Sequence, residues 1–275
     1  MSETTMFELT PGTELKVQPL FQELSFHVLI ESVLQGHTVG RVFVNQPKEP
    51  TTALIWNTMD TLLLAGDRPD SFMKTRLNGL IRKKLLPMAR ARHVPFFNLY
   101  CGSAWRSEAR DVLEGLPTEE VERKVYSARQ TPPARIEIPE GWELQRITPE
   151  LVDRQDLENA NSLRGWIDSF WWTHGEFSER GIGYCVRDEA RVLGWCLTVY
   201  VGPDRVELGA ATDERHRGMG IASMTALATV KHALRDGLTP IWQCHADNYA
   251  SNRVAERLGL TLEHRYSGYR ASLAV

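Results

Sequence analysis

A pair of closely spaced glycines, Gly218 and Gly220, is the feature that most constrains how this chain can fold. The pair follows a strand-like run at residues 206–211 and precedes a segment with apolar residues at helical spacing, which stops at Gly237. A helix start leaves backbone N–H groups unpaired and carries partial positive charge, and glycines let a pyrophosphate approach those groups. The sequence therefore predicts a phosphate-binding turn between a strand and a helix, with Arg217 at its mouth.

Two common nucleotide-binding motifs do not fit this turn. A mononucleotide P-loop carries Lys-Ser/Thr after its last glycine, whereas Gly220 is followed by Ile-Ala-Ser. The dinucleotide fingerprint needs a third small residue and an acidic ribose ligand, and no clear acid of that kind follows. What remains is an Arg-x-x-Gly-x-Ala pattern formed by Arg217, Gly220 and Ala222, with an overlapping frame that begins at Arg215.

A second motif follows at the next predicted elements. Residues 239–244 are typical of a strand, and residues 248–260 of a helix capped by Asn248 and ended by Gly259. Both motifs, in this order, resemble the Gcn5-related N-acetyltransferases (GNAT), in which the second helix starts with Asn and has a small residue three places on, here Ser251. The resemblance covers residues ~142–270.

The resemblance implies an α/β (α+β) fold, with the GNAT acyl-CoA N-acyltransferase fold in the C-terminal half and acetyl-CoA as cosubstrate. In the family, the strand before the loop splays from its neighbour, and the pantetheine bonds to strand backbone in the gap. The implied cofactor-binding residues are Ala210, Ala211, Thr212, Arg217, Gly218, Met219, Gly220, Ile221, Ala222, Asn248, Ser251 and Asn252.

Acetyl transfer to an amine needs a base for the ammonium and a proton for the leaving thiolate. Glu207 is the predicted base, because strand alternation places it on a face of small residues; a polar residue on an exposed strand face is the alternative. Family members often use a tyrosine as the acid, but Ala255 occupies that position. Ser251, Tyr266, Tyr269 and solvent remain as candidates for the acid.

The chain is long enough for two domains. Clustered prolines predict an N-terminal domain at 1–130, a linker at 131–140 and an acetyltransferase domain at 141–275. Residues 95–100 and the helical run after them echo residues 240–244 and their helix, at an offset of about 144 residues. The N-terminal domain is therefore predicted to be a degenerate GNAT-like copy without paired glycines, hence without its own CoA site; an unrelated α+β domain is the alternative.

The two-domain layout, with Gly-Trp-Cys at 194–196 and Glu-Leu-Gly at 207–209, resembles the zwittermicin-resistance type of acetyltransferase. That resemblance implies a small-molecule amine as acceptor, without naming it. An aromatic-rich segment suits the acceptor side and equally suits core packing; its members are Trp166, Phe170, Trp171, Trp172 and Phe177.

Composition narrows the classes of protein to which the chain can belong. The net charge of −3, with scattered Lys and Arg, does not indicate a nucleic-acid surface, and no apolar run of ~18 residues indicates a membrane span. Residues 1–5 lack the pattern of a signal peptide, so a cytoplasmic enzyme is expected. The 4 cysteines have no Cys-x-x-Cys spacing, which predicts buried thiols and no metal site.

Three other interpretations stay open at this point. The chain could be a CoA-binding sensor that has lost turnover, an acyltransferase for a longer acyl-CoA, or an interaction protein that acts through its N-terminal half. The oligomeric state is not indicated by the sequence.

Overall fold

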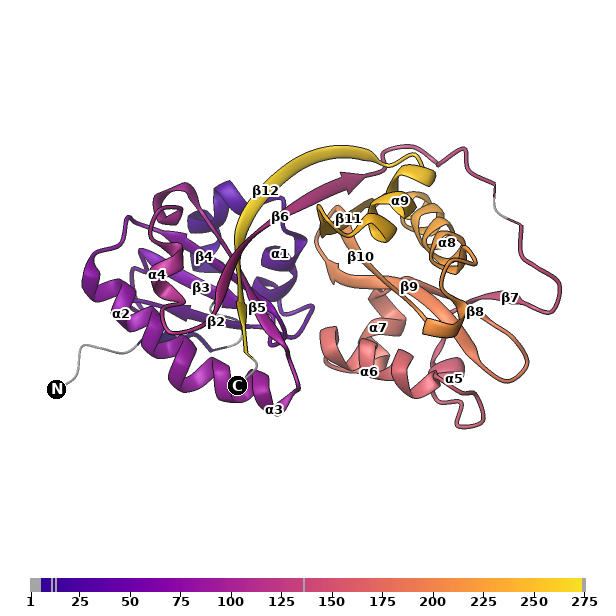
Figure 1. The fold of residues 1–275 in the computed structure, drawn as a ribbon, viewed down its shortest axis with the longest axis horizontal. Coiled ribbons are helices and arrows are strands. Elements are labelled where there is room, and N and C mark those ends of the chain that lie inside the picture. Colours follow the sequence, from indigo (N-terminus) through magenta and orange to yellow (C-terminus); the bar gives the residue numbers. More distant parts are fainter. Residues whose placement is uncertain (1–5, 11, 13, 136, 274–275) are drawn as a thin grey trace. The chain divides into compact units, whose positions relative to one another are not determined.

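The computed structural model describes residues 6–10, 12, 14–135 and 137–273, which form a mixed α/β protein of two compact units (Figure 1). Unit 1 comprises residues up to Glu122 and those from Tyr266 onward, and unit 2 comprises Arg123–Arg265. Residues 1–5, on which the expectation of no signal peptide rests, and residue 136 of the predicted linker lie outside the described residues.

The units are not the consecutive domains that the sequence suggested. Two long strands, β6 (Thr118–Ser127) and β12 (Thr261–Ser272), each cross a unit boundary. Consequently the end of β6 pairs with a strand of unit 2, and the end of β12 pairs with a strand of unit 1. Apolar periodicity cannot predict this arrangement, because it identifies strands but not which strands pair with each other.

Unit 2 is built on a sheet with the order β6-β11-β10-β9-β8-β7. Its other strands are β7 (Glu143–Arg146), β8 (Gly183–Arg187), β9 (Val192–Val201), β10 (Arg205–Thr212) and β11 (Thr239–His245). The β10–β11 pair is parallel, and the other neighbours are antiparallel. Every residue of β9 is buried, which fits a central strand covered on both faces.

Helices cover both faces of that sheet (Figure 1). On one face lie α8 (Ile221–Arg235) and α9 (Tyr249–Arg257), and α8 packs on β8 to β11. On the other face lie α5 (Pro149–Val152), α6 (Ala160–Phe170) and α7 (His174–Arg180), with α6 packed on β9. Thr148, Thr173 and Asn248 each cap a helix start by accepting a backbone N–H.

Unit 1 repeats this plan with the strand order β1-β2-β3-β4-β5-β12. Its other strands are β1 (Phe7–Glu8), β2 (Arg41–Val44), β3 (Thr52–Trp56), β4 (Thr61–Gly66) and β5 (Phe96–Cys101). Its helical segments are η1 (Glu14–Leu24), α1 (Val28–Leu34), α2 (Ser71–Leu80), η2 (Ile81–Leu85), α3 (Leu86–Ala91), η3 (Ser103–Trp105) and α4 (Ala109–Val112). The core packs Leu54, Leu64 and Phe97 of the sheet against Leu77 and Ile81 of the helices.

The strand orders of the two units share one connectivity. Each has an antiparallel meander, then a parallel pair, β4–β5 or β10–β11, and then an antiparallel strand, β12 or β6. This shared plan explains the sequence echo at an offset of about 144 residues. The internal repeat that the sequence predicts is therefore visible in the topology.

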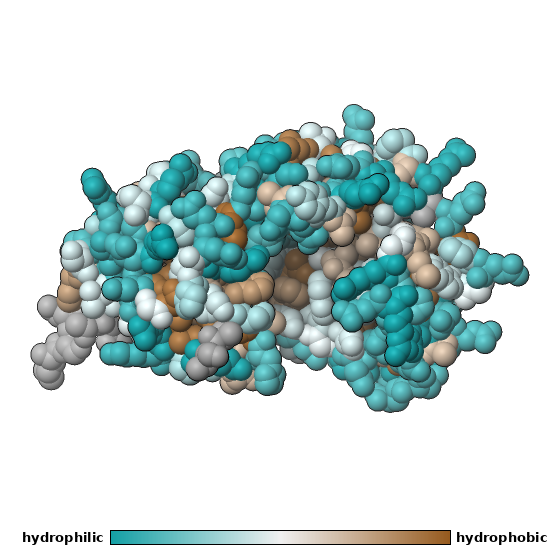
Figure 2. Space-filling view, in the orientation of Figure 1, coloured by the Kyte–Doolittle hydropathy of each residue, from teal (hydrophilic) through white to brown (hydrophobic). Residues whose placement is uncertain are grey.

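Hydrophilic side chains dominate the surface of each unit on the face shown in Figure 2. Among the described residues, no helix is both long enough and apolar enough to cross a bilayer.

Candidate functional site

The turn before α8 has the geometry that its glycines predict. Gly218 and Gly220 have φ of 81° and 85°, a left-handed conformation that suits glycine. Gly220 is the residue before the first helical turn, and its carbonyl accepts from Ser223 N and Met224 N. Within the described part of the chain, the backbone N–H groups of residues 218–222 have no acceptor. An anion can therefore bind several N–H groups at the positive end of a helix of 15 residues.

Two arginines flank this turn. Arg217 is 67% exposed, and its guanidinium lies 3.2 Å from the Glu214 carboxylate. Because a surface ion pair of this kind is weak, Arg217 can leave Glu214 and bind an anion at the turn. Arg257, near the end of α9, places Nη1 3.8 Å from where a Cβ on Gly220 would lie. Among the described residues Arg257 forms no ion pair. The sequence analysis missed Arg257, because its approach to the turn depends on how α9 packs beside α8.

Asp213 anchors the start of the turn. Its carboxylate accepts from Arg215 N at 2.8 Å and from Asn159 Nδ2 at 2.6 Å, and Arg191 lies 3.3 Å away. The Arg215 N–H bond, with help from Asn159 and Arg191, holds the pKa of the Asp213 carboxyl below its ordinary value. The sequence analysis did not single out Asp213, yet this residue ties the turn to the start of α6 and to β9.

A gap opens between β10 and β11 directly before the turn. The two strands pair in parallel from Arg205–Thr239 as far as Leu208–Trp242. Beyond that point β10 stays paired with β9 up to Thr212, and β11 stays paired with β6 up to His245. One edge of residues 209–212 is thereby left without a strand partner, which fits an extended ligand that bonds to backbone. The predicted cofactor residues Ala210, Ala211 and Thr212 lie on this edge.

Glu207 lies on β10 just before the gap and on the face toward α6. It is half-buried, it faces Tyr200 across a β-bulge at residue 199, and its Oε2 accepts from Gln243 Nε2 at 2.9 Å. On the same face, a Cβ at Gly209 would lie 2.9 Å from the Trp166 ring. Position and environment therefore suit a base between the gap and the α6 side. Sequence reasoning identified Glu207 but not Gln243.

The aromatic-rich segment divides between core and site. Trp171 and Phe177 are each 2% exposed and contact each other, so they are core residues. Trp166 and Phe170 are half-buried, with ring centroids 6.0 Å apart, and they face Trp195 and Tyr200 of β9. These rings form an aromatic surface beside Glu207. Trp172 is 51% exposed.

The predicted α9 residues are engaged in internal bonds. Asn248 Oδ1 accepts from Ser251 N at 3.1 Å, and Ser251 Oγ accepts from Trp242 Nε1 at 3.0 Å. Asn252 is 4% exposed; its amide donates to backbone carbonyls of the β11–α9 loop, and its Oδ1 accepts from Tyr126 Oη at 2.8 Å. These contacts give Asn252 a structural role, while its predicted contact with the cofactor stays a prediction.

Tyr266 requires a correction of placement. It was assigned to the acetyltransferase domain as a candidate acid, but it belongs to unit 1. There its ring packs on Phe26, His27 and Tyr100, with centroids 4.9, 4.8 and 4.9 Å away. Tyr269 also packs in unit 1, against its main core. The misassignment follows from strand exchange, since β12 leaves unit 2 before it reaches either tyrosine.

Unit 1 lacks the features that form the anion site in unit 2. The start of α2, which corresponds to the start of α8, is already capped by the Asp70 carboxylate, which accepts from Met73 N at 2.7 Å. The parallel strands stay paired as far as Leu64–Cys101, and Gly102 N then donates to Leu64 O. A phosphate would therefore meet a negative charge and an edge that is still paired.

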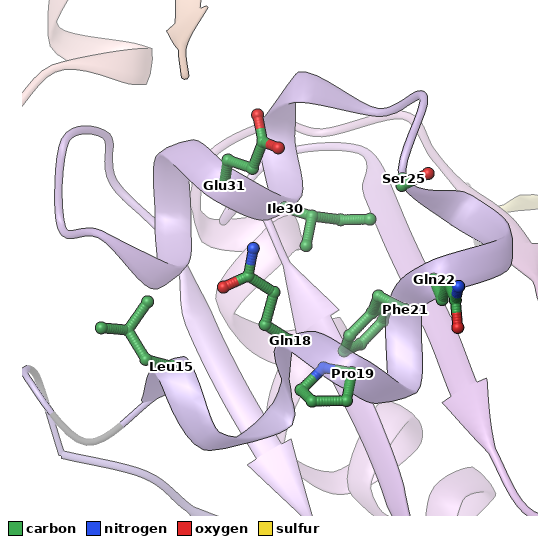
Figure 3. Close-up of a pocket in the computed structure, with 8 residues that line it drawn as sticks. All are labelled: Leu15, Gln18, Pro19, Phe21, Gln22, Ser25, Ile30 and Glu31. Atoms are coloured by element: carbon green, nitrogen blue, oxygen red, sulfur yellow. The ribbon is translucent and has the colours of Figure 1, made fainter. Parts of the chain in front are cut away.

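A cavity of about 370 Å³ does occur in unit 1, between η1 and α1 (Figure 3). Leu15, Pro19, Phe21 and Ile30 give it an apolar lining, and Glu31 contributes a carboxylate at its rim. It has neither a glycine turn nor a basic side chain, so its lining does not suit a phosphate.

The cysteines are free thiols. Burial raises the pKa of Cys185 and Cys196 to about 12 each and that of Cys101 to about 11. These thiols are therefore poor nucleophiles and poor metal ligands at neutral pH. Among the described residues, no group of His, Cys, Asp and Glu is arranged to hold a metal ion.

Comparison with known proteins relates this arrangement to a family. The family model described as GNAT acetyltransferase matches residues 18–269. The chain is 22% identical over 264 residues to an uncharacterized N-acetyltransferase of Bacillus subtilis, covering 95% of this chain and 97% of the relative.

Solved structures agree on the fold. A GCN5-related N-acetyltransferase-like protein from Streptococcus suis superposes with a TM-score of 0.68 and 19% identity, covering 94% of this chain and 98% of that one. A tandem GNAT protein from the clavulanic acid biosynthesis pathway has a TM-score of 0.56 and 13% identity, covering 98% of both chains. Both likenesses extend over the two units, and they confirm the predicted fold class.

Proposed function

Because the chain belongs to the GNAT acetyltransferase family, we propose that it transfers an acetyl group from acetyl-CoA to a primary amine of a small molecule. The observation that carries the proposal is the combination found in unit 2. A glycine turn with N–H groups that lack an acceptor lies next to an unpaired strand edge, and a half-buried carboxylate stands where that edge begins.

These features fit the parts of CoA. A pyrophosphate would be held by the N–H groups of residues 218–222, with Arg217 and Arg257 as flanking cations. The pantetheine, an extended amide-containing chain, would bond to the free edge of residues 209–212. Met219 and Tyr249, which are 54% and 78% exposed, offer apolar surface beside this path.

The residues around Glu207 would then support direct transfer. Bound acetyl-CoA supplies the activated acyl group. Glu207 accepts a proton from the ammonium, directly or through one water, which frees the nitrogen lone pair. The amine nitrogen forms its bond to the acyl carbon as the carbon–sulfur bond breaks. The nitrogen then loses a second proton to water, which leaves a neutral amide in place of the thioester. Trp166 and Phe170 shield one side of this region from water.

No side chain of unit 2 is assigned as a dedicated acid. Ala255 is fully buried and has no proton to give, and the Ser251 hydroxyl is already engaged with both Trp242 Nε1 and the Cys244 thiol. Water supplies the proton to the leaving thiolate, since a thiolate is a fair leaving group and positioning of the reactants supplies much of the rate.

A thiol-release assay with acetyl-CoA and a panel of amines tests the proposal, with Glu207→Gln as the matched variant. We expect Glu207→Gln to keep its CoA affinity and to lose ~10²–10⁴-fold in turnover at neutral pH. Much of that loss should return at alkaline pH, where more of the amine is already neutral. CoA binding without thiol release for any amine would instead indicate a CoA-binding module. Faster thiol release from a longer acyl-CoA would indicate that the longer acyl-CoA is the donor.

A further inference from the structure

Gln243 lies at the point where β10 and β11 separate. The last parallel pair of the two strands is Leu208–Trp242, so Gln243 is the first residue of β11 beyond the pairing. Strand alternation puts Gln243 on the same face as Ile241, the register partner of Glu207. Gln243 therefore stands at the head of the gap, on the side where the predicted base lies.

The side chain of Gln243 is a polar exception in an apolar run. Its neighbours along the strand, Ile241, Trp242 and Cys244, are 8%, 4% and 4% exposed, whereas Gln243 is half-buried. An apolar side chain would gain burial energy here, while an amide must find hydrogen-bond partners or lose stability. A glutamine at this position therefore calls for a polar partner, and the structure supplies Glu207.

The contact is a directed hydrogen bond. Gln243 Nε2 donates to Glu207 Oε2 at 2.9 Å. This bond fixes the position of Oε2 and restricts rotation of the Glu207 side chain. The position of the other carboxylate oxygen, Oε1, is restricted as a result.

We propose that Gln243 is a positioning residue that holds the Glu207 carboxylate in place and aimed at the acceptor amine. This inference rests on the proposed function, in which Glu207 is the base. Gln243 acts through Glu207, so it contributes to turnover and leaves the cofactor-binding turn at residues 217–222 unaffected.

A double-mutant cycle in the full chain tests the proposal, using Glu207→Gln, Gln243→Met and the combined variant. Methionine keeps the length of glutamine and removes the donor. We expect Gln243→Met to lower kcat roughly 10- to 100-fold, as for a misplaced catalytic group, while the KM for acetyl-CoA changes less than about twofold. In the Glu207→Gln background the same change should cost almost nothing, because there is no base left to position.

Gln145→Met is the matched control. Gln145 is also half-buried on a strand of unit 2, and its Oε1 accepts from Arg187 Nε at 2.8 Å, but β7 is remote in strand order from the gap. It should lose a similar side-chain bond without the loss in kcat.

The outcomes are distinguishable. A wild-type kcat for Gln243→Met, or equal losses in the presence and absence of Glu207, would overturn the positioning role while leaving the base intact. Full activity of Glu207→Gln would instead show that Glu207 is not the base, and the premise of this proposal would fail. A loss confined to melting temperature in Gln243→Met, with unchanged kcat at a temperature where the fold is intact, would also overturn it.

Discussion

Replacing Gly220 by aspartate should weaken CoA binding through charge, with little damage to the fold. The φ of 85° at Gly220 makes most side chains cost about 1 kcal/mol, but Asp and Asn tolerate this conformation better than others. A new Cβ would lie 3.7 Å from Met224 Cε and 3.8 Å from Arg257 Nη1, which are ordinary contacts. The substitution therefore fits sterically before any ligand binds.

The magnitude follows from Coulomb's law. A carboxylate about 5 Å from a phosphate charge, at an effective dielectric constant of roughly 20–40, costs about 2–3 kcal/mol. That energy corresponds to a Kd raised roughly 30- to 150-fold relative to an uncharged side chain of the same shape. Asparagine is that side chain, so Gly220→Asn is the reference for Gly220→Asp.

Titration calorimetry with CoA at low and high ionic strength is the appropriate assay. The difference between the two variants should shrink at high salt, because mobile ions screen an exposed charge pair. Melting temperatures of both variants report on the fold separately. Equal affinities of the Asp and Asn variants, at low salt, would show that residues 218–222 do not hold the phosphates.

Three further outcomes are expected. Calorimetry should give one CoA site per chain, since the start of α2 carries the Asp70 cap; a stoichiometry of two would contradict the degenerate copy. Tyr126→Phe should lower the free energy of unfolding by about 1–3 kcal/mol, measured by urea denaturation, because the buried Asn252 Oδ1 loses its donor; no change would mean that water replaces the hydroxyl. Cys185 and Cys196, with pKa values of about 12, should resist iodoacetamide at pH ~8 in the folded chain and react in denaturant, because the reactive thiolate is only a minute fraction so far below their pKa; rapid alkylation of either would contradict their burial.

Much of unit 2 could be predicted from the sequence because its signals are local. Strand alternation, glycines at φ near 80° and the Asn248 cap each act over a few residues, and the structure shows β11, α8 and the capped α9 where these signals place them. Glu207 was identified for the same reason, since the residues that share its face of the strand are small.

The contacts that complete the candidate site are not local. Gln243, Arg257 and Asp213 reach their positions through strand register and helix packing, which one sequence does not report. The same limit explains Tyr266. Its position near the C-terminus suggested the acetyltransferase domain, but the partner of its strand is β5, more than half the chain away.

The exchange of β6 and β12 has a consequence for how the chain is made. Unit 1 needs Tyr269–Ser272 as the partner of Leu99–Phe96, so its sheet cannot be finished until the ribosome has synthesised all of unit 2 and these four residues after it. Unit 2 already has the partner strand of β11 when its other residues emerge, because Arg123–Ser127 precede them. The half that is translated first is therefore the half that is completed last, and removal of residues 269–272 would expose the edge of β5 in the unit that carries no glycine turn.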